Sequence, residues 1–186
     1  MPIQVHDHRS GAVQLTILGS ALLAAALLCA LFAAGAGVYG GRTGDRRWVE
    51  SARRGVFAMA ALLTTAVVII ELAFLRDDFS FALVADHSST TTPTFYKLTA
   101  MWSSQEGSLL LWAWVLSLAS SGVLFITRNR HREIVPWATA VLAAIAAFFT
   151  GLMILKAQPF AHLDPAPVEG AGLTPLLRNP YMAVHP

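Results

Sequence analysis

Charged residues divide the chain into four long apolar runs. These runs cover about residues 13–38, 55–75, 107–127 and 134–155. A helix needs roughly 20 apolar residues to cross the hydrocarbon core of a bilayer, so each run is long enough to do so. Leu, Ala, Val and Ile occur on all sides of the runs, without the single apolar stripe of a soluble amphipathic helix. The pattern therefore predicts four transmembrane helices.

The composition favours a membrane chain over a single soluble domain. Of the 186 residues, 55% are hydrophobic and 13% are charged, and the mean hydropathy is +0.57, which is above that of ordinary soluble domains. We predict an all-α, polytopic integral membrane protein. Residues 1–12 form its N-terminal segment, residues 13–155 its four-helix transmembrane region, and residues 156–186 its tail.

The two longer segments outside the apolar runs differ in their predicted structure. Thr92 and Pro93 are typical of a helix start, and Phe95, Leu98 and Trp102 follow at i, i+3 and i+7, which predicts a short helix on the membrane surface. The tail after the fourth run holds six of the nine prolines, which exclude a long regular helix. Composition alone leaves open whether this tail is a disordered linker or an ordered segment.

The basic residues predict which side of the membrane each connection faces. Segments 40–54 and 128–133 carry eight bases and three acids, whereas the N-terminus, residues 71–106 and the tail from Lys156 carry five bases and eight acids. Basic connections stay in the cytoplasm, so both termini are predicted to lie outside. A cleaved signal peptide is the alternative for the first run, but the bases follow this run and its apolar stretch is too long.

The stretch "WSSQEGSLLLW", residues 102 to 112, places polar residues at the start of the third run. Ser103 and Glu106 match a capping box, in which each side chain accepts a hydrogen bond from a free backbone N–H. Trp102 is predicted at the outer interface, and Trp112, about 15 Å deeper, is predicted to face protein or lipid. We assign structural roles at this junction to Trp102, Ser103, Glu106, Gly107, Ser108 and Trp112.

The same stretch resembles the W-G-x-H/Q-E-G-S-L-L-L-W signature of the cytochrome c maturation haem lyases, the CcmF/CycK family. "DDFSFALVADHSS" and "PTFYKLTAMW" are similar to that family's outer loop before the third helix. "PFAHLDPAPVEGAGLTPLLRNPYMAVHP" is similar to its N-P-F…P-x-E-G-x-x-L-N-P-L-L-x-x-P…H-P-P loop. The resemblance runs from about residue 71 to the end, and it implies that the tail is an ordered cap over the helices.

Several family features differ or are absent in this sequence. Ser103 stands where the family often has Gly, Gln105 where it has His or Gln, and Thr174 where it has Asn, so no haem-ligand role is given to Gln105. The tryptophan-rich W-G-x-W-W-x-W-D haem motif is absent. The resemblance therefore implies an N-terminal portion that is not active alone, whether a split gene product, a truncation or an incomplete reading frame.

The resemblance also implies a function and a site. The family transfers haem from a periplasmic haem chaperone to apocytochrome c at the bacterial inner membrane. His185, in the matching H-P element, is the expected axial ligand of haem presented on the outer face. The expected partners are the remainder of the lyase or other membrane subunits, the chaperone, apocytochrome c and membrane lipid, with no nucleic acid. Alternatives are a scaffold subunit that binds no haem and a small transporter.

The remaining reactive residues limit what this chain does by itself. All six histidines lie outside the apolar runs, so the chain cannot alone hold a transmembrane bis-histidine haem. His6 and His8 are expected in a disordered tail. Cys29 is the sole cysteine, which leaves no thiol pair and no C-x-x-C-H motif. Glu71, the one acid within the runs, is expected near the outer boundary, with a lipid headgroup or Arg76 as its partner.

Overall fold

The computed structural model describes residues 5–127 and 133–181, with side chains from residue 13 onward. Its long helices are α1 (Val5–Thr43), α2 (Arg46–Leu75), α5 (Gln105–Ile126) and α6 (Val135–Lys156). Each contains a stretch that is long and apolar enough to span a membrane. The predicted all-α, polytopic membrane fold with four such helices is therefore confirmed.

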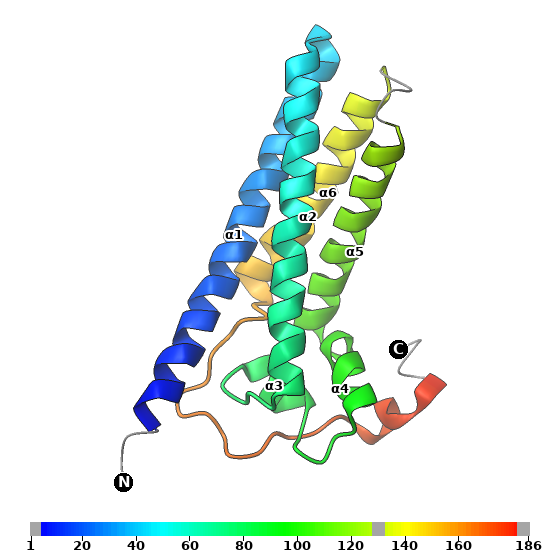
Figure 1. Ribbon diagram of the computed structural model, residues 1–186. Coiled ribbons are helices and arrows are strands. Elements are labelled where there is room, and N and C mark those ends of the chain that lie inside the picture. The colour runs from blue at the N-terminus through cyan, green and yellow to red at the C-terminus, as the bar shows by residue number, and fades with distance from the viewer. Residues whose placement is uncertain (1–4, 128–132, 182–186) are drawn as a thin grey trace.

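The four long helices form a bundle in which α1 and α5 each pack against both α2 and α6 (Figure 1). Consecutive helices run in opposite directions. The turn between α1 and α2 consequently lies at the same end of the bundle as the connection between α5 and α6. We call this end the arginine-rich end, because Arg42, Arg46, Arg47, Arg53 and Arg54 belong to it.

Small side chains mark the packing seam of each helix. Buried positions recur every three or four residues, as in left-handed helix packing. The buried residues are Leu23, Ala26, Ala30 and Ala33 in α1, Ala52, Val56, Met59, Leu63, Ala66 and Ile70 in α2, Gly107, Leu110, Ala113, Ser117, Ser120 and Leu124 in α5, and Thr139, Ala143, Ala146, Thr150 and Met153 in α6. Small residues allow close backbone approach where lipid supplies no hydrophobic drive for helix association.

The first two helices extend beyond the apolar runs that predicted them. The backbone is helical from Val5, so the expectation of a disordered segment at His6 and His8 is wrong. The turn after α1 consists of Gly44, with φ +69°, and Asp45, which caps α2 by accepting a hydrogen bond from the Arg47 backbone N–H at 2.9 Å. The basic segment is thus mainly helix rather than loop.

A compact cap covers the opposite end of the bundle (Figure 1). It contains α3 (Ala82–His87), α4 (Thr94–Ala100), the 3₁₀ helices η1 (Met101–Ser103) and η2 (Pro175–Arg178), and the tail that follows α6. The helix predicted after Pro93 is therefore present as α4 and η1. Phe95 and Leu98 on α4 are exposed, with 51% and 42% of their surface accessible, as expected for a helix lying against lipid headgroups.

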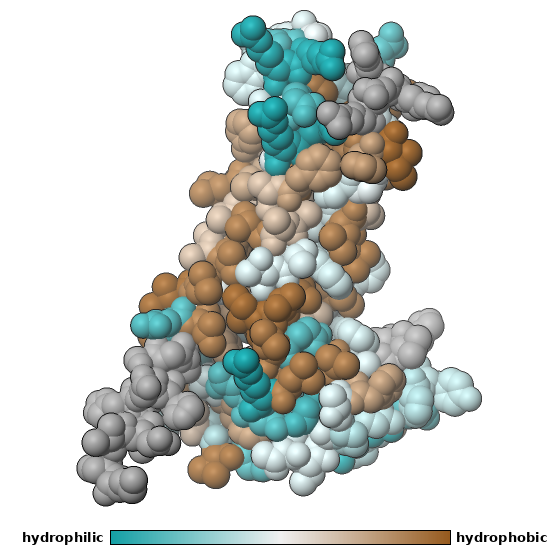
Figure 2. Space-filling view, viewed as in Figure 1, coloured by the Kyte–Doolittle hydropathy of each residue, from teal (hydrophilic) through white to brown (hydrophobic). Residues whose placement is uncertain are grey.

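The described part of the tail is ordered by backbone hydrogen bonds to the segment around α3. The Leu163 N–H donates to the Ser80 carbonyl at 2.8 Å, and the Ala171 N–H donates to the Ala85 carbonyl at 2.7 Å. Of the two alternatives for the tail, the ordered cap is therefore the one observed up to residue 181. A broad apolar surface separates the polar cap from the arginine-rich end (Figure 2).

Candidate functional site

The junction before α5 is capped by Ser104, so the predicted capping box at Ser103 and Glu106 is wrong. The Ser104 hydroxyl accepts a hydrogen bond from the Gly107 N–H at 3.0 Å. Ser103 lies in η1, and its hydroxyl donates to the Ala100 carbonyl at 2.6 Å. With the cap at Ser104, the third helical position is Gly107, which has no side chain to reach back. Glu106 lies in the first turn, where the helix dipole favours an acid.

Gly107 and Ser108 hold η1 tightly against the start of α5. A Cβ atom on Gly107 would collide with the Met101 carbonyl, so no larger residue fits without movement of the backbone. The Ser108 hydroxyl donates to the Trp102 carbonyl at 2.8 Å. The family-like stretch therefore forms a tight corner that links the cap to the bundle.

The two tryptophans inside α5 have different environments. Trp112 is 64% exposed on the outer surface of the bundle. This position agrees with lipid, one of the two environments expected for it. Trp114 points inward instead, and its indole N–H donates to the Thr64 hydroxyl of α2 at 2.9 Å. This hydrogen bond connects α5 to α2 within the apolar region.

An ion pair that the sequence analysis missed holds α4 against the end of α2. The Lys97 ammonium lies 2.6 Å from the Asp77 carboxylate, and the Lys97 side chain is only 10% exposed. Asp77 has φ +54°, a conformation that non-glycine residues rarely adopt, in the turn directly after α2. The residues are 20 positions apart, so no local spacing pattern could have indicated the pair.

A second link joins the tail to the loop between α3 and α4. The Glu169 carboxylate accepts from the Thr90 backbone N–H at 2.8 Å and from the Thr90 hydroxyl at 2.7 Å. These two hydrogen bonds lower the pKa of Glu169 below its ordinary value, and the bond from the Thr90 hydroxyl has the larger effect on the pKa. Next to it, a Cβ on Gly170 would collide with the Ser88 carbonyl. The P-V-E-G part of the family-like tail is thus a docking element.

The structure describes the side chains of two histidines in the cap, His87 and His162. His185 lies outside the described residues. The His87 Nδ1 is 3.1 Å from the Leu83 carbonyl of its own helix, which agrees with a structural role. His162 pairs with Phe81 in an isolated antiparallel bridge, and its Nδ1 is buried without a hydrogen-bond partner. In residues 5–127 and 133–181, no cluster of three or more potential metal ligands occurs.

Glu71 lies near the cap end of α2, where the sequence places it. One of its carboxylate oxygens, Oε2, is buried without a hydrogen-bond partner. Arg76 is exposed after the end of the helix, and within the described part of the chain no ion pair connects the two residues. Arg76 is therefore not the partner that was considered for Glu71.

Known proteins with similar sequences are described as cytochrome c-type biogenesis proteins. No protein-family model matches the chain. Cytochrome c-type biogenesis protein CcmF of Pseudomonas aeruginosa is 37% identical over 170 residues, covering 91% of this chain and 26% of the relative. CycK of Rhizobium meliloti is 34% identical over 169 residues, covering 91% and 25%. The chain thus spans about a quarter of the length of these curated relatives.

The solved structure of a cytochrome c haem lyase, CcmF, has the same arrangement of helices. It superposes with a TM-score of 0.72 at 33% sequence identity, over 78% of this chain and 24% of that chain. Four helices able to span a membrane, together with these relatives, fit an inner membrane protein. The sequence and structural similarities agree, and the chain belongs to the CcmF/CycK family of cytochrome c-type biogenesis proteins as a CcmF-like N-terminal portion.

Proposed function

We propose that this chain is the N-terminal part of a cytochrome c haem lyase, which transfers haem from a periplasmic haem chaperone to apocytochrome c. Haem is the cargo of this reaction, and its vinyl groups become joined to the apocytochrome thiols. The chain supplies a membrane scaffold, an outer cap and one haem ligand, His185. The remainder of the lyase, including the tryptophan-rich haem motif, comes from further sequence or another subunit.

The observation that carries this proposal is the ordered cap at the end of the bundle opposite the arginines. The cap consists of the segments that resemble the family's outer loops, and Glu169 docks the tail onto Thr90 within it. The arginine-rich end stays in the cytoplasm by the distribution of basic residues. The cap and both termini then face the periplasm, and His185 follows the described part of the tail in the sequence.

A His185→Ala variant in the assembled lyase tests the haem-ligand role. We expect loss of cytochrome c maturation and a changed haem absorption spectrum in the purified assembly, at unchanged protein level. His87→Gln serves as the control, because His87 already contacts a carbonyl of its own helix. Wild-type cytochrome yield in the His185→Ala variant would contradict the proposal.

The alternative is a scaffold subunit that docks partners and binds no haem. The ordered cap supports it, because the tail docked by Glu169 onto Thr90 provides a fixed surface for partners. In that case removal of His185 leaves the haem spectrum of the assembly unchanged, while loss of the cap prevents assembly. The spectrum therefore separates the two functions.

A further inference from the structure

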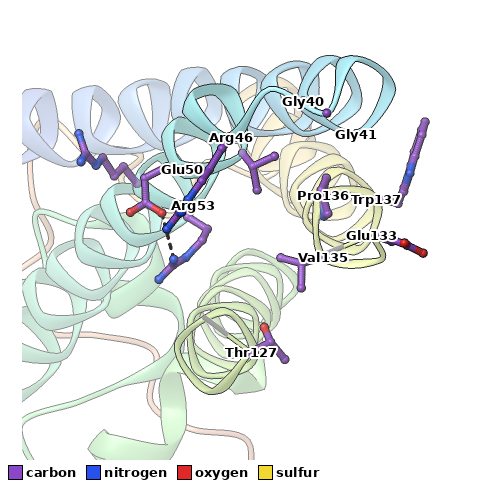
Figure 3. A pocket seen from close by; sticks show the side chains of 13 residues that line it. Gly40, Gly41, Arg46, Glu50, Arg53, Thr127, Glu133, Val135, Pro136 and Trp137 are labelled. Atoms are coloured by element: carbon purple, nitrogen blue, oxygen red, sulfur yellow. Dashed lines mark hydrogen bonds and ion pairs between the residues drawn. The ribbon is translucent and has the colours of Figure 1, made fainter. Parts of the chain in front are cut away.

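A cavity opens at the arginine-rich end of the bundle (Figure 3), the end opposite the cap (Figure 1). Its volume is about 680 Å³. It lies between the turn connecting α1 to α2, the end of α5 and the start of α6. The proposed haem-transfer function uses the other end of the bundle, so this cavity needs a separate explanation.

The polar wall of the cavity is basic. Arg46, Arg53 and Arg54 line it, together with the acids Glu50 and Glu133. Glu50 is already engaged, because its Oε2 accepts from Arg53 Nη1 at 3.0 Å. Arg46 and Arg54 are exposed at the surface of the cavity, with Glu133 as the remaining acid. The cavity therefore offers an excess of cationic donors to an anionic group.

Arg53 has hydrogen-bonding capacity that the described part of the chain does not use. The residue is 8% exposed, and its guanidinium carbon lies 5.8 Å from the centre of the Phe57 ring. Its Nε is buried and has no hydrogen-bond partner among the residues that the structure describes. A buried, unpaired guanidinium N–H is costly. An anion held by the neighbouring arginines would be well placed to satisfy it, since the planar guanidinium suits the oxygens of a phosphate group.

The other wall of the cavity is apolar. Val49, Val135 and Trp137 line it, and Trp137 is 44% exposed. Just beyond it, Ile126 is 79% exposed and Ile134 is 66% exposed on α5 and the start of α6. A free inorganic anion makes no favourable contact with such a surface, whereas the acyl chains of a lipid would cover it. The combination of basic pocket and adjoining apolar surface is typical of a phospholipid site between transmembrane helices.

We propose that this cavity binds the phosphodiester headgroup of an anionic phospholipid. Its phosphate oxygens accept hydrogen bonds from Arg46, Arg53 and Arg54, and its acyl chains lie along the exposed apolar residues at the ends of α5 and α6. The bound lipid fills the opening between the α1–α2 turn and the adjoining ends of α5 and α6, and it fixes the spacing of these elements. This site is independent of which membrane face the arginine-rich end occupies.

Native mass spectrometry of the full 186-residue chain, titrated with phosphatidylglycerol or phosphatidylcholine in detergent, tests the proposal. We expect preferential retention of phosphatidylglycerol. An Arg46→Gln or Arg54→Gln variant should lower its affinity about fivefold, since each arginine near an anionic lipid contributes about 1 kcal/mol. Arg53→Gln should lower it at least as much, but the exposed Arg54→Gln variant keeps the test valid if Arg53→Gln fails to fold.

Arg47→Gln is the matched control. It removes the same charge from the helical turn that contains Arg46, and Arg47 is not among the residues lining the cavity. Its phosphatidylglycerol affinity should stay within twofold of wild type. Equal losses in the Arg47→Gln and Arg54→Gln variants would show a general surface-charge effect and overturn the proposal. Displacement of the lipid by excess inorganic phosphate would show a simple anion site and would also overturn it.

Discussion

Glu169 and Thr90, 79 positions apart in the sequence, share two hydrogen bonds that dock the tail onto the loop between α3 and α4. The pair is solvent-exposed, yet it lies beside backbone hydrogen bonds that join Ala171 to Ala85 in α3 and Gly172 to Ser88 in the same loop. We expect this contact to stabilise the docked position of the proline-rich tail, together with those backbone hydrogen bonds.

Docking of the tail should weaken at acidic pH. The pKa of Glu169 is lowered by its hydrogen bonds to Thr90, so the carboxylate contributes its full stabilisation above its ordinary pKa of about 4.5. This contribution is lost as the pH falls below that value and through the pKa of the folded state. Hydrogen exchange of the Ala171 and Gly172 amides, measured at pH 6 and at pH values below 4.5, should show loss of protection on acidification.

A Glu169→Gln variant separates this effect from general acid denaturation. Glutamine keeps a carbonyl oxygen that can accept from Thr90 but does not titrate, so protection of these two amides should be lower at pH 6 and nearly independent of pH. If the variant and the wild-type chain lose protection in parallel, Glu169 does not control the docking.

The position of the helix cap before α5 predicts unequal effects of two adjacent serines. Ser104→Ala removes the hydroxyl that accepts from the Gly107 N–H and should lower the free energy of unfolding by about 1 kcal/mol. Ser103→Ala removes only a hydroxyl that donates to the Ala100 carbonyl and should cost less. Denaturation of the purified variants in mixed micelles measures both. A larger loss for Ser103→Ala would restore the capping box that the structure contradicts.

Close contact between α1 and α6 predicts that Gly37 does not tolerate a larger side chain. A Cβ at this position would lie 2.9 Å from the Pro136 carbonyl oxygen and 3.1 Å from the Ala140 nitrogen. Gly37→Leu should therefore destabilise the bundle by about 1–3 kcal/mol. At Gly35, two residues earlier in the same helix, a Cβ meets nothing within 4 Å. Gly35→Leu should keep the thermal midpoint of the wild type, and similar midpoints for the two variants would argue against the packing.

The hydrogen bond between Trp114 and Thr64 predicts a difference between the two tryptophans of α5. Trp114→Phe removes the donor to Thr64 and should lower the free energy of unfolding by about 0.6–1.7 kcal/mol, the range of interhelical hydrogen bonds within membranes. Trp112→Phe should have a smaller effect, because Trp112 is 64% exposed on the bundle surface. Equal stabilities of the two variants would indicate that the hydrogen bond contributes nothing.

The sequence predicts the number and type of the long helices because apolar length is a strong signal in membrane proteins. It does not predict where α1 begins and ends or where α2 begins, since charges mark the edge of the hydrocarbon rather than the end of a helix. Arg46 and Arg47 are helical, and the turn contains only Gly44 and Asp45. A helix can continue into water, where its polar side chains are solvated.

Contacts between distant segments account for most of what the sequence left open. The ion pair of Lys97 with Asp77 and the burial of Arg53 depend on how helices meet, although the pair of Arg53 with Glu50 has the local i, i+3 spacing. The packing seams were missed for another reason. Ala, Gly and Ser differ from their neighbours in size more than in hydropathy, so a search for small residues every three or four positions would have found them.

Two nearly equivalent interpretations existed at the α5 junction, and the sequence favoured the wrong one. Ser103 has an acid three residues later, as a capping box requires, whereas Ser104 has Gly107. In the 3₁₀ turn Met101–Ser103, the Ser103 hydroxyl donates a hydrogen bond to the Ala100 carbonyl. Ser104 is therefore the residue that caps the helix. The outcome depends on the close approach of Gly107 to the Met101 carbonyl, a tertiary constraint that no capping motif contains.

The central claim is that the cap faces the periplasm and the arginine-rich end faces the cytoplasm. Replacing Cys29, the sole cysteine, by Ala gives a background for single cysteines at Val168, which is 98% exposed in the cap, and at Arg47. A membrane-impermeant maleimide should label Val168→Cys in spheroplasts and Arg47→Cys only after lysis. Labelling of Arg47→Cys in intact spheroplasts with protection of Val168→Cys would contradict the orientation and the proposed haem-transfer function with it.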